Sequence, residues 1–146
     1  MNEKIVYSIQ LAVSTDSIRQ CYPVMSQLRP HLTESEFVNR VTLMKLEGYH
    51  LVYLQENGKI ISVGGYRFST MLSRGSFMYI DDLVTDEPFR GKGYGKILMD
   101  WMFQKAKDAG CNQIDLDSGV QRFDAHEFYF RKKMKIISYH FTRKFK

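Results

Sequence analysis

Cysteine is scarce in this sequence: among 146 residues there are only Cys21 and Cys111, and neither belongs to a CxxC pair. A disulfide framework or a zinc site is therefore not expected, and a reducing cytoplasm is the expected compartment. The four histidines have no metal-ligand spacing, so we expect no metal. No apolar run approaches the roughly 18 residues of a membrane-spanning helix, so no membrane partner is expected either.

Acidic residues are scarce at one end of the chain. Residues 121–146 carry eight lysines and arginines against Asp124 and Glu127, whereas the preceding 120 residues are nearly neutral; the whole chain has a net charge of +5. A basic segment of this kind is typical of nucleic-acid binding, which is one hypothesis for the function. The length predicts a single domain, residues 1–146, that buries a sizeable core without cross-links.

The first half of the sequence contains strand and helix patterns in a regular order. The predicted elements are a strand at 7–13, a helix after Ser14 that Pro23 interrupts, a helix after the capping box Thr33–Glu36, and strands at 49–55, 59–68 and 76–85. Asn57-Gly58 predicts a tight hairpin. Gly64-Gly65 inside a strand indicates a bulge or a close backbone approach.

The second half changes to an alternation of helices and strands. It predicts a helix at about 93–109, a strand at 113–117, a helix at 124–132 and a last strand at 136–143. A strand–helix–strand crossover makes the strands at 76–85 and 113–117 parallel neighbours. The fold class is therefore α/β of the mixed α+β kind, with helices covering a mixed sheet.

A glycine-rich, basic stretch, Arg90-Gly91-Lys92-Gly93-Tyr94-Gly95-Lys96, stands between a predicted strand and a predicted helix. Glycines let backbone N–H groups face outward, and the start of a helix leaves such groups unpaired with a partial positive charge. Together they can hold a phosphate or pyrophosphate, to which the three basic side chains add charge. The alternative is a surface turn that happens to be rich in glycine. The spacing fits neither a P-loop nor a Rossmann fingerprint.

The sequence resembles the GNAT superfamily of N-acetyltransferases. Arg90-x-x-Gly93-x-Gly95 matches the (Q/R)-x-x-G-x-(G/A) signature, and Ala125-His126-Glu127-Phe128-Tyr129 is similar to the A-x-x-F-Y segment of that family. The resemblance covers nearly the whole chain. It implies a central mixed, mostly antiparallel sheet of about six to seven strands with a splayed pair of parallel strands, flanked by about four helices.

The resemblance also implies that acetyl-coenzyme A is the acetyl donor. Backbone groups of Asp82, Leu83 and Val84 would hold its pantetheine arm and acetyl carbonyl, with an N–H near Val84 stabilising the oxyanion. The loop residues Arg90, Gly91, Lys92, Gly93, Tyr94, Gly95 and Lys96 would bind the pyrophosphate. Phe128 would contact the cofactor, and Tyr129 would be the general acid for the departing thiolate. Without the resemblance, Tyr129 would be interpreted as a half-buried helix tyrosine.

Asp81 and Asp82 are adjacent carboxylates on an otherwise apolar strand, where charge is costly unless it is paired or hydrated. One of them is the candidate base or counter-ion for a substrate ammonium, and the sequence does not decide which. The alternative is an ion pair with Arg67 or Arg74. Because adjacent strand residues point to opposite faces, at most one of the two aspartates is expected to face a given pocket.

Two positions depart from the family pattern. Arg122 stands where an asparagine that contacts the cofactor is common, so it is either a cofactor contact or a solvated arginine. Lys133 stands where glycine ends the helix, and a lysine in a left-handed cap is strained.

The sequence thus predicts an enzyme that transfers acetyl from acetyl-coenzyme A to a primary amine of a small molecule or peptide, by direct attack in a ternary complex. Many relatives are dimers, which allows a homodimer here without requiring one. The alternatives are a basic nucleic-acid-binding module and a catalytically idle acetyl-coenzyme A sensor. With the resemblance, the basic segment is better explained as the rim of a polyanionic cofactor's site, and no nucleic-acid partner is expected.

Overall fold

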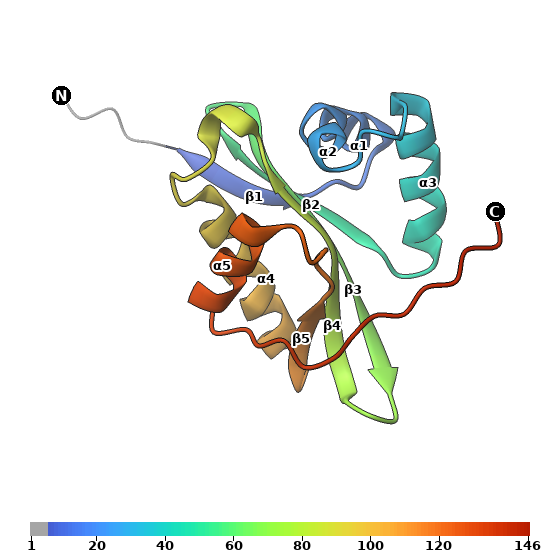
Figure 1. The fold of residues 1–146 in the computed structure, drawn as a ribbon. Coiled ribbons are helices and arrows are strands. Elements are labelled where there is room, and N and C mark those ends of the chain that lie inside the picture. The colour runs from blue at the N-terminus through green and yellow to red at the C-terminus, as the bar shows by residue number, and fades with distance from the viewer. Residues whose placement is uncertain (1–5) are drawn as a thin grey trace. The chain divides into compact units, whose positions relative to one another are not determined.

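The computed structural model describes residues 6–146, which fall into two compact parts, up to Asp115 and from Leu116 onward (Figure 1). One five-stranded sheet, in the order β1-β2-β3-β4-β5, dominates the chain. The elements are β1 (Tyr7–Leu11), α1 (Thr15–Gln20), α2 (Tyr22–Leu28), α3 (Glu34–Leu46), β2 (His50–Glu56), β3 (Lys59–Met71), β4 (Gly75–Thr85), the short 3-10 helix η1 (Glu87–Phe89), α4 (Tyr94–Asp108), β5 (Gln113–Leu116) and α5 (Phe123–Arg131).

Local sequence signals explain where the first elements begin and end. Pro23 lies at the start of α2 and separates it from α1, as expected. Thr33 and Glu36 form the predicted capping box at the start of α3. Asn57 and Gly58 both have positive φ, 50° and 78°, which is the requirement of the tight hairpin between β2 and β3.

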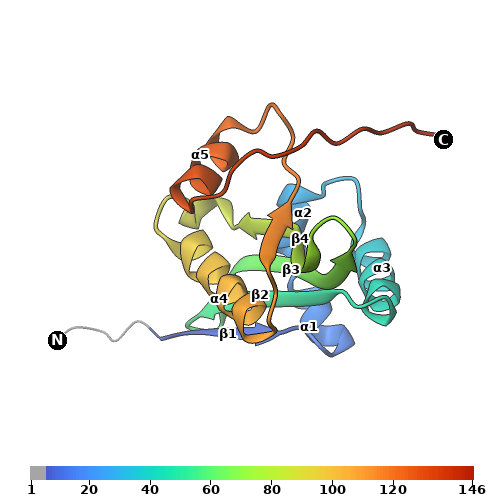
Figure 2. The same ribbon diagram turned by 90° about the horizontal axis from the view of Figure 1, so that it is seen from below.

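The strands β1 to β4 pair antiparallel in sequence order, and β5 lies beside β4 and runs parallel to it (Figure 1). Helix α4 covers one face of this sheet and α1, α2 and α3 cover the other (Figure 2). The neighbouring glycines of β3 mark these two faces: a Cβ on Gly64 would meet the Met102 side chain of α4, and one on Gly65 would meet the Tyr49 ring. The fold class predicted from the sequence is thus confirmed.

A β-bulge interrupts the pairing of β3 with β4. Gly65 stands opposite Asp82 and Tyr66 stands opposite Ile80, so that Asp81 is an extra residue on β4. The bulge that Gly64-Gly65 predicts is therefore present. It lies at the acidic pair, where it changes the direction of the side chains.

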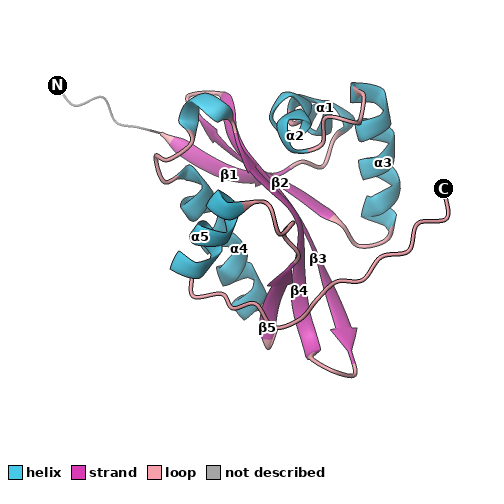
Figure 3. Ribbon diagram, in the orientation of Figure 1, coloured by secondary structure: helices cyan, strands magenta, loops and turns pink. Residues whose placement is uncertain are grey.

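The second part contains α5 and an extended tail. The prediction of a last strand at 136–143 is wrong: no strand follows α5 (Figure 3). A strand needs a ladder of backbone hydrogen bonds, and within this part the described backbone beyond Met134 makes none. The sheet consequently has five strands rather than six or seven.

The helices also differ in number from the prediction. The interruption at Pro23 raises the number of α-helices from the expected four to five. Lys133 has a φ of 62°, so the helix keeps its left-handed end despite the strain that a lysine adds.

Candidate active site

The glycine-rich loop joins η1 to the start of α4. Gly91 and Gly93 have φ values of 76° and 92°, a left-handed backbone that glycine adopts without strain. Gly93 is the N-cap of α4 and offers no side-chain hydrogen bond to the first turn. The N–H groups of that turn therefore remain available to an anion, and the positive end of the helix dipole faces it. This geometry fits the pyrophosphate of coenzyme A.

The basic side chains of the loop already have partners. Arg90 donates from Nε to the Thr85 carbonyl (2.9 Å) and from Nη2 to the Gln27 side chain (3.1 Å). Lys96 pairs with Asp100 at 3.0 Å, and the Lys92 ammonium lies 5.7 Å from the centre of the Phe89 ring. Arg90 therefore joins the loop to the end of β4, whereas Lys92 and Lys96 supply charge from its exposed side.

Gln27 of α2 anchors the same loop, and no motif in the sequence indicates this role. Its amide donates to Asp86 (2.7 Å) and its carbonyl oxygen accepts from the Glu87 backbone (3.0 Å) as well as from Arg90. A single glutamine thus connects α2 with the segment that leads into the loop. The partners are about 60 positions apart, and no local pattern signals such a contact.

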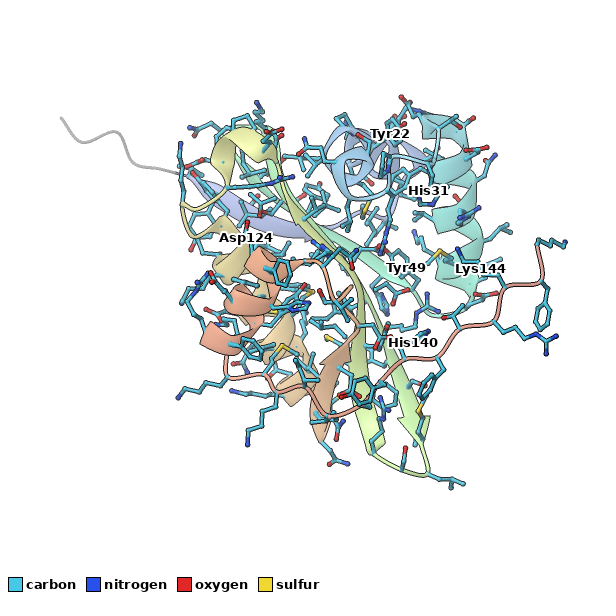
Figure 4. The ribbon with its side chains drawn as sticks, in the orientation of Figure 1. Tyr22, His31, Tyr49, Asp124, His140 and Lys144 are labelled. Atoms are coloured by element: carbon cyan, nitrogen blue, oxygen red, sulfur yellow. The ribbon has the colours of Figure 1, made fainter. Side chains whose placement is uncertain are left out.

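A cavity of about 340 Å³ lies beside β4, between the sheet and the helices α2 and α3. Its lining combines apolar side chains, two carboxylates, two arginines and a histidine. The lining residues are Met25, Arg29, His31, Leu32, Phe37, Arg40, Val41, Met44, Tyr49, Tyr79, Asp81 and Asp82. Figure 4 labels two of them, His31 and Tyr49. The volume lies at the lower end of the range for small-molecule sites.

Asp81 forms an ion pair with Arg67 of β3, which is one of the two ion pairs that the sequence offers as an alternative to a role in catalysis. The guanidinium donates to both carboxylate oxygens, at 3.0 and 2.7 Å. Burial raises the pKa of Asp81, and the attraction of Arg67 only partly opposes this effect. Asp81 is therefore a half-buried carboxylate with more affinity for a proton than an ordinary aspartate. The other arginine considered, Arg74, pairs instead with Asp115 of β5 at 2.7 Å.

Asp82 is held by two residues that the sequence did not indicate. Arg29, at the end of α2, donates to Oδ1 (2.9 Å), and the Tyr49 hydroxyl donates to Oδ2 (2.7 Å). Tyr49 is almost completely buried, and burial together with the Asp82 charge raises its pKa well above the usual value. The phenol therefore stays protonated as a donor. Arg29 also donates to the Asp81 carbonyl (3.0 Å), so it holds the backbone of the bulge as well.

Both aspartates line the same cavity, and the expectation that at most one faces a given pocket is wrong. The alternation rule assumes regular pairing, and the extra residue in β4 breaks that regularity. Beyond the bulge, Leu83 pairs with Gly64 and Val84 with Val63, which continues β4 in regular register toward the loop.

The second part of the chain contains the remaining candidates, Arg122, Phe128 and Tyr129. Arg122 precedes α5 as its N-cap residue, and the other two lie on the helix with their rings 5.6 Å apart, nearly edge to face. Burial raises the pKa of Tyr129, and Arg122 opposes that rise. The hydroxyl is therefore protonated at neutral pH, which a general acid requires.

Comparison with known proteins agrees with this geometry. The Acetyltransferase (GNAT) family matches residues 14–134. An uncharacterized N-acetyltransferase of Bacillus subtilis (strain 168), YhdJ, is 37% identical over 132 residues, 90% of this chain and 93% of that protein. An aminoalkylphosphonate N-acetyltransferase of Salmonella typhimurium is 30% identical over 88 residues, 60% of this chain and 57% of its own. The crystal structure of glucosamine-6-phosphate N-acetyltransferase from Arabidopsis thaliana superposes with a TM-score of 0.76 at 25% identity, over 97% of this chain and 99% of that one.

The chain belongs to the GNAT acetyltransferase family. It is an acetyl-coenzyme A-dependent N-acetyltransferase, which transfers an acetyl group to an amine, as the sequence predicts. No group of three or more histidine, cysteine, aspartate or glutamate side chains in residues 6–146 is arranged to hold a metal ion. None of the helices in that range is long and apolar enough to cross a membrane.

Proposed function

We propose that the acceptor is the primary amine of a small molecule bound in the cavity beside β4, and that it attacks the acetyl group directly in a ternary complex. The observation that carries this proposal is the position of the cavity. It contains both aspartates of β4, and the same strand continues through Leu83 and Val84 toward the loop that fits a pyrophosphate. Relatives whose names specify an aminoalkylphosphonate or glucosamine 6-phosphate as acceptor support a small molecule.

Asp81 is the proposed base in this mechanism. An ammonium has no lone pair, so the acceptor must lose a proton before it attacks. The raised pKa of Asp81 suits it to take that proton, directly or through a water molecule. Asp82 is bound at both oxygens by Arg29 and Tyr49, and we assign it the role of fixing the bulge.

The remaining roles belong to the end of β4, the loop and α5. A backbone N–H near Val84 stabilises the oxyanion that forms when the amine nitrogen bonds to the carbonyl carbon. Asp82, Leu83 and Val84 hold the pantetheine arm through backbone groups, and the amides of Gly91 to Gly95 hold the pyrophosphate. When the C–S bond breaks, Tyr129 donates its proton to the departing sulfur. Phe128 and Arg122 are assigned contacts with coenzyme A.

We also propose that residues 1–146 act as one domain, because the family match runs across both compact parts. The free thiols of Cys21 and Cys111 suit a reducing cytoplasm.

The direct test of the proposed function is coenzyme A release measured with a panel of small amines and a lysine-containing peptide. Release with the peptide only would overturn the choice of a small molecule, and release with none would overturn the function itself.

Replacing Asp81 with asparagine is expected to lower kcat/KM at least about 100-fold, because the base is lost while the shape is kept. In the parent enzyme kcat/KM should fall as the pH drops through the Asp81 pKa, which burial places above that of an ordinary aspartate. The variant should lose this acidic limb. The measurement is the pH profile of initial rates.

The matched control for this experiment is Asp115→Asn. Asp115 is a carboxylate of similar exposure with its own arginine, Arg74, but it lies outside the cavity. Equal losses in both variants would assign the effect to a broken ion pair instead of a lost base.

Replacing Gly93 with alanine is expected to weaken acetyl-coenzyme A binding and to cost about 1–2 kcal/mol of stability, because a φ of 92° strains any residue with a Cβ. The matched control is Gly110→Ala, since Gly110 has a φ of 76° just beyond the other end of α4. Both variants should lose similar stability in urea, and only Gly93→Ala should bind the cofactor more weakly by calorimetry. Equal affinities would contradict the role of the loop.

A further inference from the structure

The cavity beside β4 carries two kinds of charge at different depths. Asp81 and Asp82 lie at its inner wall on β4, where their side chains are largely buried. Arg40 and His31 lie at its outer side on and before α3, where they are exposed. A small molecule that fills the cavity therefore meets carboxylates at one end and basic side chains at the other.

The inner charges are largely compensated within the protein. Arg67 binds both oxygens of Asp81, and Arg29 together with the Tyr49 hydroxyl binds those of Asp82. Each carboxylate oxygen keeps a second lone pair, which can accept a hydrogen bond from an amine. The inner end thus suits one amino group, and it lacks the free negative charge that a polyamine would need.

The outer charge is not compensated in the same way. Arg40 has no hydrogen bond or ion-pair partner among residues 6–146, and neither has His31. The Glu36 carboxylate attracts both side chains and offsets part of their charge, but its hydrogen bonds are made with Thr33 at the start of α3. The Arg40 guanidinium therefore keeps its N–H donors available to bind an oxyanion with two parallel hydrogen bonds.

We propose that the acceptor carries an oxyanion group, such as a phosphate or phosphonate, in addition to its amine, and that Arg40 with His31 forms the subsite for this group. The inference rests on the proposed function and names the acceptor class. The amine lies at Asp81 and the oxyanion lies at the mouth of the cavity. Acceptors with a second positive charge at the far end are rejected, because that charge would meet the Arg40 guanidinium.

The experiment compares three short primary amines that differ in the charge of their far end: 2-aminoethyl phosphate, ethanolamine and 1,2-diaminoethane. We expect kcat/KM, from coenzyme A release, to fall in that order, with about tenfold or more between the first and the second. Arg40→Gln should remove most of this preference through a higher KM for 2-aminoethyl phosphate, with little change for ethanolamine. Arg40→Lys should keep most of it because the charge is retained.

Lys45→Gln is the control for net charge, because Lys45 lies on the same helix and outside the cavity lining. It should leave the preference unchanged. Equal kcat/KM for the three amines, or an equal loss for all of them in Arg40→Gln, would overturn the oxyanion subsite while the proposed function stands. If no amine releases coenzyme A, the proposed function fails. Calorimetric binding of 2-aminoethyl phosphate, weakened by Arg40→Gln or not, then decides the subsite independently.

Discussion

Replacing Tyr129 with phenylalanine is expected to lower kcat by about 100-fold or more, because the departing thiolate then has no positioned proton donor. The aromatic ring is kept, so the dissociation constant for acetyl-coenzyme A should not change. Burial raises the pKa of Tyr129, so the parent enzyme should lose activity only at a pH above the usual range of tyrosine. The variant should lose this alkaline limb. Steady-state rates across pH, with calorimetric cofactor binding, measure all of these quantities.

The matched control for that change is Tyr139→Phe, which removes an exposed hydroxyl from the same part of the chain. It should leave kcat unchanged. A Tyr129→Phe enzyme with full kcat would remove Tyr129 from the mechanism and return it to the alternative of a packing residue. A variant that loses cofactor binding along with kcat would show that the hydroxyl helps to bind acetyl-coenzyme A, so that the loss of kcat could not be assigned to proton donation alone.

Replacing Gly65 with alanine is expected to lower the free energy of unfolding by roughly 1–3 kcal/mol, the usual cost of overfilling a packed core. The added Cβ would overlap the hydroxyl oxygen and ring of the buried Tyr49, so that this side chain must move. Tyr49 would then lose its hydrogen bond to Asp82, and activity should fall together with stability. Urea unfolding and initial rates are the two measurements.

Gly64→Ala is the neighbouring control for this prediction. Its Cβ would meet Met102 Sδ and Val52 Cγ1, both at 3.3 Å, and the flexible methionine can shift to make room. The cost should therefore be smaller than at Gly65. In a Tyr49→Ala background the Gly65→Ala change should become less costly, because residues in contact couple in a double-mutant cycle. Additive costs would mean that the Tyr49 ring is not what excludes a side chain at Gly65.

The features that the sequence predicted correctly depend on local chemistry. Asn57-Gly58 and the capping box at Thr33 act within four residues, and the pattern alone indicates them. The loop from Gly91 to Gly93 is similar, because its positive φ angles require glycine. The backbone geometry of the loop that we propose for the cofactor could therefore be predicted from a short stretch of residues.

The surroundings of the two aspartates, by contrast, depend on contacts between distant positions. Arg29 and Asp82 are 53 residues apart, Tyr49 and Asp82 are 33 apart, and neither pair has a spacing that indicates contact. Gly64-Gly65 predicts the bulge but not its effect on the side chains of the next strand, because register is a property of the pair of strands. The incorrect prediction of a strand at 136–143 has a similar cause. Alternation of apolar residues favours a strand, but a strand forms only where a neighbouring backbone supplies hydrogen bonds.

The extra residue at Asp81 divides β4 into two segments that can change independently in evolution. Up to the bulge, β4 presents side chains to the cavity that we propose for the acceptor, and after it the strand continues in its own register through Leu83 and Val84 to the loop. Substitutions before the bulge, or on α2 and α3, can therefore alter the choice of amine without shifting the backbone that is assigned to coenzyme A. A lineage that carries this bulge can change its acceptor repeatedly while its acetyl donor stays the same.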